Sequence, residues 1–253
     1  LEVKPRIFFQ DAPGVSSNIF FIKTDEGVVW IDTGMTVADV QAVVEEAGHS
    51  QDEITLLINT HADIDPIGGN SFFSAPKLAH EKTLQRMRKA GRPEEELPTQ
   101  TFNGDSTCLN IGGFQIELVY MGGHKIDQTI VWLPEQKVLI PSDLVFQGRY
   151  PFMMGSDVPK WADALKKLPD FEPEVILPGH GTMVSWDDIN LQLAYMETTW
   201  QMVEEMLHQG VSTEEMFKNP KLPRVDTWDK QDFFERNIVE IVEQIKRRDN
   251  AAM

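Results

Sequence analysis

The chain has 253 residues, and 41% of them are hydrophobic, which is enough to bury the core of one large domain or two small ones. Its formal net charge is −17, so phosphate backbones and anionic lipid surfaces repel it, and nucleic acid and membranes are poor partners for it. The single cysteine, Cys108, excludes an internal disulfide and is interpreted as a small buried apolar residue.

The first third of the chain alternates between strand-like and helix-like stretches. Short apolar runs predict paired strands over 17–23 and 27–32, with a turn between them. A helix is predicted over 37–47, with Thr36 as its N-cap and Gly48 just after its end. The next predicted elements are a buried strand over 54–59, a loop over 61–70 that opens a new helix, a helix over 81–90, and a polar, flexible loop over 92–101.

The rest of the chain turns to strands and then to helices. Strands are predicted over 114–120, 129–133, 137–140 and 174–177, and a short helix over 161–168. After residue 185 the sequence predicts a long helix over 191–209, a helix that starts with a capping box at Ser212, and a last helix with the apolar stripe Phe234, Ile238, Ile241 and Ile245. That stripe is typical of a core or a dimer face. These elements indicate an α/β chain with two sheets and outer helices.

Three of the six histidines follow predicted strands and have turn-forming residues close by. They are His61, His124 and His180. Loops at strand ends are where a rigid scaffold presents functional groups, and glycine lets the backbone approach closely there. We therefore expect these three histidines to act together, and we interpret the other three as ordinary surface or structural residues.

Acidic residues accompany these histidines. His61, Asp63 and Asp65 occupy alternate positions, which point the same way in an extended loop, and Asp143 ends a predicted buried strand. Carboxylates so close together repel each other unless a cation lies between them. Imidazole and carboxylate ligands suit zinc, iron and manganese, so the pattern predicts a site for divalent metal.

The order of these motifs resembles the metallo-β-lactamase superfamily over nearly the whole of residues 1–185. The matching pieces, in chain order, are Asp32-Thr33-Gly34, the segment from His61 to Gly69, Gly123-His124, Asp143 and Gly179-His180-Gly181. The ordered set is far more specific than any one of its pieces. The resemblance implies a four-layer αβ/βα sandwich with the metal site at one edge, between the two sheets.

The resemblance also implies roles for single residues. His61, Asp63 and His124 would bind a first metal ion, Asp65 and His180 a second, and Asp143 would bridge the two. Asp32 would brace the site by hydrogen bonds without binding metal. The whole of 1–253 is then expected to be one metallo-β-lactamase-like domain, with a sandwich core over 1–185 and a helical extension over 186–253.

Two residues depart from the family's His-x-His-x-Asp-His pattern. Asp63 replaces the second histidine, and Asp63 is itself able to ligate. Pro66 replaces the last histidine and cannot ligate, although proline suits the first turn of a helix. We therefore expect one or two divalent ions, with zinc favoured, iron and manganese as alternatives, and a weaker second site.

The predicted activity is metal-dependent hydrolysis of an ester, thioester, lactone or amide bond of a small molecule by a metal-activated water. Asp65 is the predicted catalytic residue. Arg149 and Tyr150 are predicted to bind substrate because they follow Asp143 closely, and Lys125 is a further candidate.

Two alternatives stay open at this stage. One is a non-haem di-iron redox enzyme acting on oxygen or nitric oxide, and the other is a non-catalytic binding protein with a decayed second site. A homodimer is also open. We expect a soluble protein, with the cytoplasm favoured and a processed exported form as the alternative.

Overall fold

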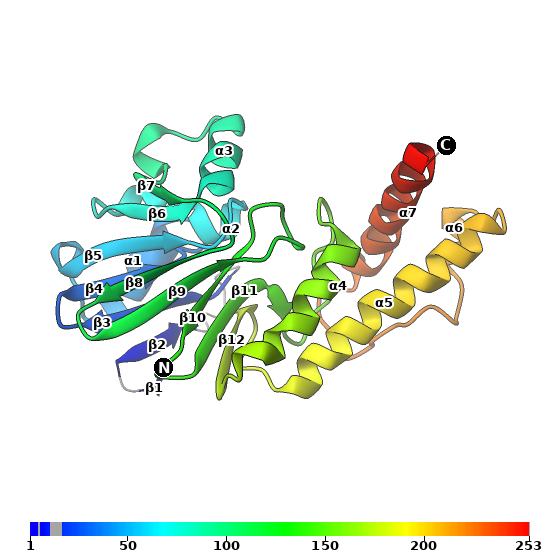
Figure 1. The fold of residues 1–253 in the computed structure, drawn as a ribbon. Helices are drawn as coiled ribbons and strands as arrows, with labels where there is room; N and C mark the ends of the chain where they lie inside the picture. Colours follow the sequence, from blue (N-terminus) through cyan, green and yellow to red (C-terminus); the bar gives the residue numbers. More distant parts are fainter. Residues whose placement is uncertain (5, 11–16, 253) are drawn as a thin grey trace.

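The computed structural model describes residues 1–4, 6–10 and 17–252 of the chain. Two β-sheets pack face to face (Figure 1). The first has the strand order β1 (Glu2–Lys4), β2 (Ile7–Gln10), β3 (Ile19–Thr24), β4 (Gly27–Ile31), β5 (Ile54–Asn59), β6 (Lys77–His80) and β7 (Gln100–Phe102). The second has the order β12 (Val175–His180), β11 (Val138–Phe146), β10 (Thr129–Leu133), β9 (Phe114–Tyr120) and β8 (Ser106–Ile111).

Helices cover the outer face of each sheet, and this confirms the predicted four-layer arrangement. One apolar cluster fills the space between the sheets, a second joins the first sheet to its helix, and the largest joins the second sheet to the C-terminal helices. The helices are α1 (Val37–Glu46), α2 (Ile64–Ile67), α3 (Glu81–Lys89), α4 (Val158–Lys167), α5 (Trp186–His208), α6 (Thr213–Phe217) and α7 (Asp232–Ala252), and the 3-10 turns are η1 (Gln51–Glu53), η2 (Asn70–Phe72), η3 (Glu94–Glu96) and η4 (Leu168–Phe171).

The first sheet brings two functional segments to one edge. Strands β4, β5, β6 and β7 run parallel to one another, so their carboxyl ends meet at the same edge. Asp32 follows β4 directly, and His61 lies two residues after β5. The predicted cap of α1 is confirmed, because the Thr36 hydroxyl accepts from Asp39 N–H and the Asp39 carboxylate accepts from Thr36 N–H.

The second sheet brings the other functional segments to its edge. Strand β11 was predicted to end at residue 140, but it continues to Phe146, so Asp143 lies inside the strand rather than at its end. The register with parallel β12 shifts on both sides of Ser142, whose φ is +48°. This irregularity marks a bulge beside Asp143, a common way of redirecting a side chain next to a functional site. His180 is the last residue of β12.

The C-terminal helices pack against the outer face of the second sheet (Figure 1). The apolar stripe of α7 is fully buried inside the chain, so it is core and not a dimer face; its members are Phe234, Ile238, Ile241 and Ile245. Among the described residues, no helix is both long enough and apolar enough to cross a membrane.

Several short elements escaped the sequence prediction. Strands β1, β2 and β6 were missed. The loop predicted over 92–101 instead contains the turn η3 and the start of edge strand β7. Cys108 was predicted to be buried, but it lies exposed on β8, the edge strand of the second sheet, where alternate residues face solvent.

Candidate metal centre

Asp32 and Thr60 fix the orientation of His61. The Asp32 carboxylate accepts from the Thr60 backbone N–H at 2.9 Å and from the Thr60 hydroxyl at 2.6 Å. Because that hydroxyl donates to Asp32, its oxygen accepts from Nδ1–H of His61, 3.1 Å away. This leaves a lone pair on Nε2 of His61. Burial raises the pKa of the Asp32 carboxyl to about 7, although both hydrogen bonds from Thr60 oppose the shift.

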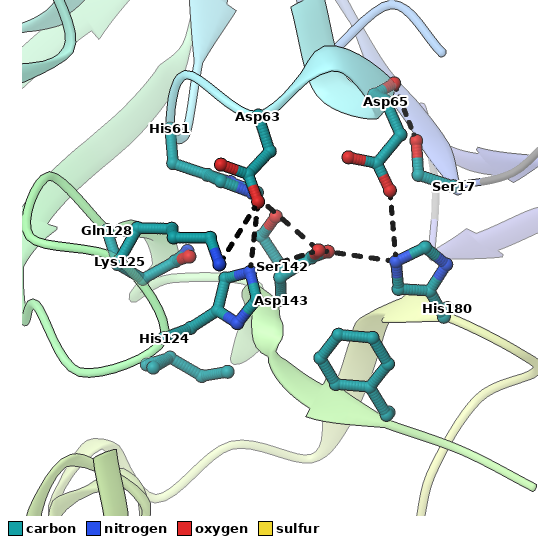
Figure 2. A network of polar contacts seen from close by, with 12 residues as sticks. Ser17, His61, Asp63, Asp65, His124, Lys125, Gln128, Ser142, Asp143 and His180 are labelled. Atoms are coloured by element: carbon teal, nitrogen blue, oxygen red, sulfur yellow. Dashed lines mark hydrogen bonds and ion pairs between the residues drawn. The ribbon is translucent and has the colours of Figure 1, made fainter. Parts of the chain in front are cut away.

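The buried imidazoles of His61 and His124 contact each other edge to face, and the carboxylates of Asp63 and Asp143 lie beside them (Figure 2). Nε2 of His61 is 3.6 Å from Oδ2 of Asp143, and Nε2 of His124 is 3.6 Å from Oδ2 of both Asp63 and Asp143. Within the described part of the chain, Nε2 of His61 and both ring nitrogens of His124 have no hydrogen-bond partner. Burial and the nearby Lys125 ammonium lower the pKa of His124 to about 4, so its ring is neutral at pH 7.

These atoms fit a divalent metal ion. Ligand atoms of His61, Asp63 and His124 lie within 4.8 Å of one another, and so do those of His61, Asp65 and Asp143. Two ligands of a tetrahedral ion, each about 2.1 Å from the metal, lie about 3.4 Å apart, close to the separations found here. Unpartnered buried nitrogens beside ionised carboxylates are the donor set that zinc, iron and manganese prefer.

His180 occupies the other half of the centre, where its nitrogens do have partners. Its Nε2 lies 3.2 Å from Oδ2 of Asp143 and 3.3 Å from Oδ2 of Asp65. Its Nδ1 lies 3.2 Å from Nη1 of Arg149, and the ring of Phe146 stacks on its face. Burial disfavours the imidazolium, but the carboxylates of Asp143 and Asp65 outweigh burial and raise the pKa of His180 to about 9. Arg149 opposes that protonation, because a guanidinium only donates and needs Nδ1 as an acceptor.

The backbone beside Asp143 requires a glycine, and Pro66 lies in the loop that carries two other candidate ligands. A Cβ on Gly179 would lie 2.0 Å from Oδ1 of Asp143, so only glycine lets β12 pass this close. Pro66 lies in the first turn of α2, as predicted, and its carbonyl accepts from the backbone N–H and the hydroxyl of Thr33. Pro66 therefore anchors the loop that carries Asp63 and Asp65, and it offers no ligand atom.

A cavity of about 480 Å³ opens over the centre. Carboxylates and His180 line the cavity, together with two cationic side chains and several apolar side chains. The residues that line it are Met35, Ala62, Asp63, Ile64, Asp65, Asp143, Phe146, Arg149, Phe152, His180, Lys230 and Phe233. Arg149 therefore lies where the sequence predicted it, at the cavity.

Tyr150 does not reach the cavity, and we withdraw its assignment to substrate binding. Its side chain is fully buried and packs against Tyr195, Trp228 and Phe234. Its hydroxyl accepts from the backbone N–H of Val225. Both residues follow the end of β11 at Phe146, and their side chains point in different directions: Arg149 lines the cavity, whereas Tyr150 packs into the cluster formed with the C-terminal helices.

The sequence prediction missed three neighbours of the centre. Arg86 of α3 and the buried Asp127 contact the segment that carries Asp63, and Lys230 lines the cavity from the region just before α7. Arg86 and Lys230 lie far from every ligand in the sequence, so no local signal marked them, whereas Asp127 follows His124 by three residues and its position after a ligand was a signal that could have been used. Lys125 was considered for substrate binding, but its ammonium lies 3.4 Å from Asp63 and donates to the Met154 carbonyl.

The remaining histidines lie apart from the centre, as predicted. His80 caps α3 by accepting from Lys82 N–H, His49 pairs with Glu53, and His208 pairs with Asp249.

Comparisons with known proteins agree with this geometry. A family model described as the metallo-beta-lactamase superfamily matches residues 12–180. The chain is 25% identical over 177 residues to metallo-beta-lactamase type 2 of Bacteroides fragilis, covering 66% of this chain and 70% of that protein. It is 26% identical over 189 residues to metallo-beta-lactamase type 2 of Bacillus sp. (strain 170), covering 71% and 72%.

Solved structures show the same fold. The metallo-beta-lactamase from Pontibacter korlensis has a TM-score of 0.68 and 23% identity, covering 78% of this chain and 97% of its own. The DIM-1 metallo-beta-lactamase has a TM-score of 0.67 and 23% identity, covering 78% and 95%.

The two-sheet sandwich, the edge site of histidines and aspartates and these matches together define a metallohydrolase. The chain belongs to the metallo-beta-lactamase superfamily, because the family model covers more than half of it. Membership implies that the protein is a hydrolase that depends on divalent metal ions.

Proposed function

We propose that the protein hydrolyses an ester, thioester, lactone or amide bond of a small molecule that carries an anionic group. The observation that supports this best is that two imidazole nitrogens, without hydrogen-bond partners among the described residues, converge with two carboxylates beneath a cavity of about 480 Å³. A volume of this size suits a small molecule rather than a polymer chain.

We assign His61, Asp63 and His124 to the first metal ion, Asp65 and His180 to the second, and Asp143 to both. A divalent ion bound there supplies Lewis acidity and lowers the pKa of water to near neutrality. Zinc is the ion we propose, because two imidazoles and a carboxylate are typical zinc ligands; iron and manganese share that preference. Iron bound with a visible absorption band and oxygen consumption would instead favour the redox alternative.

Asp65 is the residue we propose for proton transfer. Its carboxylate lines the cavity, and its side chain is 18% exposed, so it can reach a water molecule or a leaving group there. His180 holds one oxygen of that carboxylate, and the Ser17 hydroxyl donates to the Asp65 backbone carbonyl, so the side chain is fixed in place. Asp65 would orient the attacking water and then protonate the leaving group.

Arg149 and Lys230 are the residues we propose for the anionic group. Both line the same cavity, and a guanidinium suits a carboxylate because it can donate two parallel hydrogen bonds. Met35, Ile64, Phe152 and Phe233 line the cavity beside them and would contact the apolar part of the substrate.

The test is a panel of esters, thioesters, lactones and amides, each as an anionic and a neutral analogue, assayed with zinc-loaded protein. We expect turnover of at least one bond type, a lower KM for its anionic analogue, and a KM raised at least about tenfold for that analogue in Arg149→Gln, since a charged hydrogen bond contributes about 1.5–3 kcal/mol.

Asp65→Asn completes this experiment. With the metal content unchanged, we expect kcat to fall about 100-fold or more, within the range of general acid–base catalysis. Fully loaded protein that hydrolyses none of the four bond types would refute the proposed activity. Equal KM values for anionic and neutral analogues would refute the anionic preference alone.

A further inference from the structure

Asp63 places an extra carboxylate at a centre that already contains Asp65 and Asp143. Three carboxylates this close repel one another unless cations compensate them. A carboxylate can also bind metal through one oxygen or two, so its rotation must be fixed if the ligand geometry is to be defined. The structure has a partner for Asp63 that both compensates its negative charge and fixes the rotation of its carboxylate.

That partner is Arg86, which reaches the centre from α3. Its Nη2 donates to Oδ1 of Asp63 at 2.7 Å, and its Nη1 donates to Oδ1 of Asp127. Asp127 is fully buried, and its Oδ2 accepts from the backbone N–H of Ala62 at 2.8 Å. The guanidinium thus joins the side chain of Asp63 to a second carboxylate that holds the backbone between His61 and Asp63.

The two oxygens of Asp63 therefore have different partners. Oδ1 accepts from Arg86, whereas Oδ2 lies 3.6 Å from Nε2 of His124 and 3.4 Å from Nζ of Lys125 (Figure 2). Asp63 occupies the N-cap position of α2, but its side chain makes no capping hydrogen bond there. The carboxylate is thus oriented by Arg86 and not by the helix, and only Oδ2 faces the other ligands.

We propose that Arg86 is a positioning residue that makes Asp63 a one-oxygen metal ligand: its guanidinium binds Oδ1, offsets the added negative charge, and leaves Oδ2 for the metal ion beside His61 and His124. A lysine at this position would keep the charge, but it lacks the planar fork that spans two carboxylates. Partners of this kind behind a ligand typically change metal affinity about 10- to 100-fold. The proposal concerns metal binding only and is independent of the substrate.

The experiment measures the affinity of the first metal by competition with a chromophoric chelator, with zinc and separately with cobalt, whose absorption bands report the ligand geometry. We expect Arg86→Lys to weaken this affinity about 10- to 100-fold and to shift the cobalt bands. Arg88→Lys is the matched control, since Arg88 is an exposed arginine on the same helix, and we expect it to leave both readouts unchanged.

Two further parent variants distinguish two roles of Arg86: orienting the Asp63 carboxylate, and supporting the loop through Asp127. In Asp63→His, and likewise in Asp63→Asn, no carboxylate remains for the guanidinium to orient, so adding Arg86→Lys should change metal affinity less than about threefold. Melting temperatures in excess chelator show whether each variant is folded.

Two results would overturn the proposal. One is an unchanged affinity and cobalt spectrum in Arg86→Lys. The other is the same loss of affinity on all three backgrounds, because that would mean Arg86 acts through Asp127 and Ala62 alone.

Discussion

The two halves of the metal centre differ in how the protein satisfies its own donor atoms. In the half formed by His61 and His124, both Nε2 atoms lack a hydrogen-bond partner among the described residues. In the half formed by His180, Nε2 contacts Asp143 and Nδ1 contacts Arg149, and Pro66 offers no ligand. A metal ion in the first half would satisfy buried polar atoms, whereas a metal ion in the second half would have to displace existing contacts. The first half should therefore bind more tightly.

The test with the largest expected effect replaces one histidine in each half, in separate variants. We expect His61→Ala to lower the affinity for the more tightly bound metal ion more than about 100-fold. This exceeds the usual effect of a residue that only supports a ligand. His180→Ala should leave that affinity within about threefold. Chelator competition on both variants measures this affinity. A larger loss of affinity in His180→Ala than in His61→Ala would mean that the half formed by His180 binds metal more tightly.

The second test uses pH. The pKa of His124 is lowered to about 4, so above pH 5 its ring has no proton for the metal to displace, and His124 should add no pH dependence to metal affinity at the first half from pH 6 to 9. The pKa of His180 is raised to about 9, so below pH 9 a proton competes with the metal. Affinity at the second half should then rise about tenfold per unit from pH 7 to 9.

Metal titrations at fixed ionic strength across that range check both slopes. A flat second-half affinity between pH 7 and 9 would mean that the Arg149 contact, and not the carboxylates, sets the protonation of His180.

The smallest expected effect comes from Pro66. Pro66→His adds a donor in the first turn of α2, beside Asp65, so we expect affinity at the second half to rise about tenfold. Pro66→Ala is the control, because it removes the proline ring without adding a ligand. Equal affinities in Pro66→His, Pro66→Ala and the parent protein would show that α2 does not direct this position toward the centre.

The ligand set could be proposed because three histidines follow predicted strands and because the order of the motifs resembles the metallo-β-lactamase superfamily. His61 and His180 follow apolar runs, and in each sheet a parallel strand lies beside that run, β4 beside β5 and β11 beside β12. Asp143 was assigned to the centre, but it was predicted to follow the end of a strand, whereas it lies within β11. The bulge at Ser142 depends on a positive φ in a non-glycine residue, which no pattern marks.

Other errors arose where tertiary packing decides. Arg149 and Tyr150 are adjacent in the sequence, yet Arg149 lines the cavity, whereas Tyr150 is buried in the cluster that the C-terminal helices form with the second sheet. Arg86 was missed because it contacts Asp63 and Asp127 from 23 and 41 positions away, and periodicity carries no information about such pairs.

Part of the cavity wall comes from outside the segment that matches the family. Lys230 and Phe233 line the cavity, and the backbone of Asp229 is hydrogen-bonded to the backbone of Gly148 and Tyr150, which connects that part of the cavity to the segment carrying Arg149. The family match ends at residue 180. Substitutions near the start of α7 can therefore alter which molecules enter, while every metal-binding side chain stays the same. Under the proposed function, one part of the substrate contact surface would therefore lie outside the family-matched segment and could diverge while the candidate metal ligands stay the same.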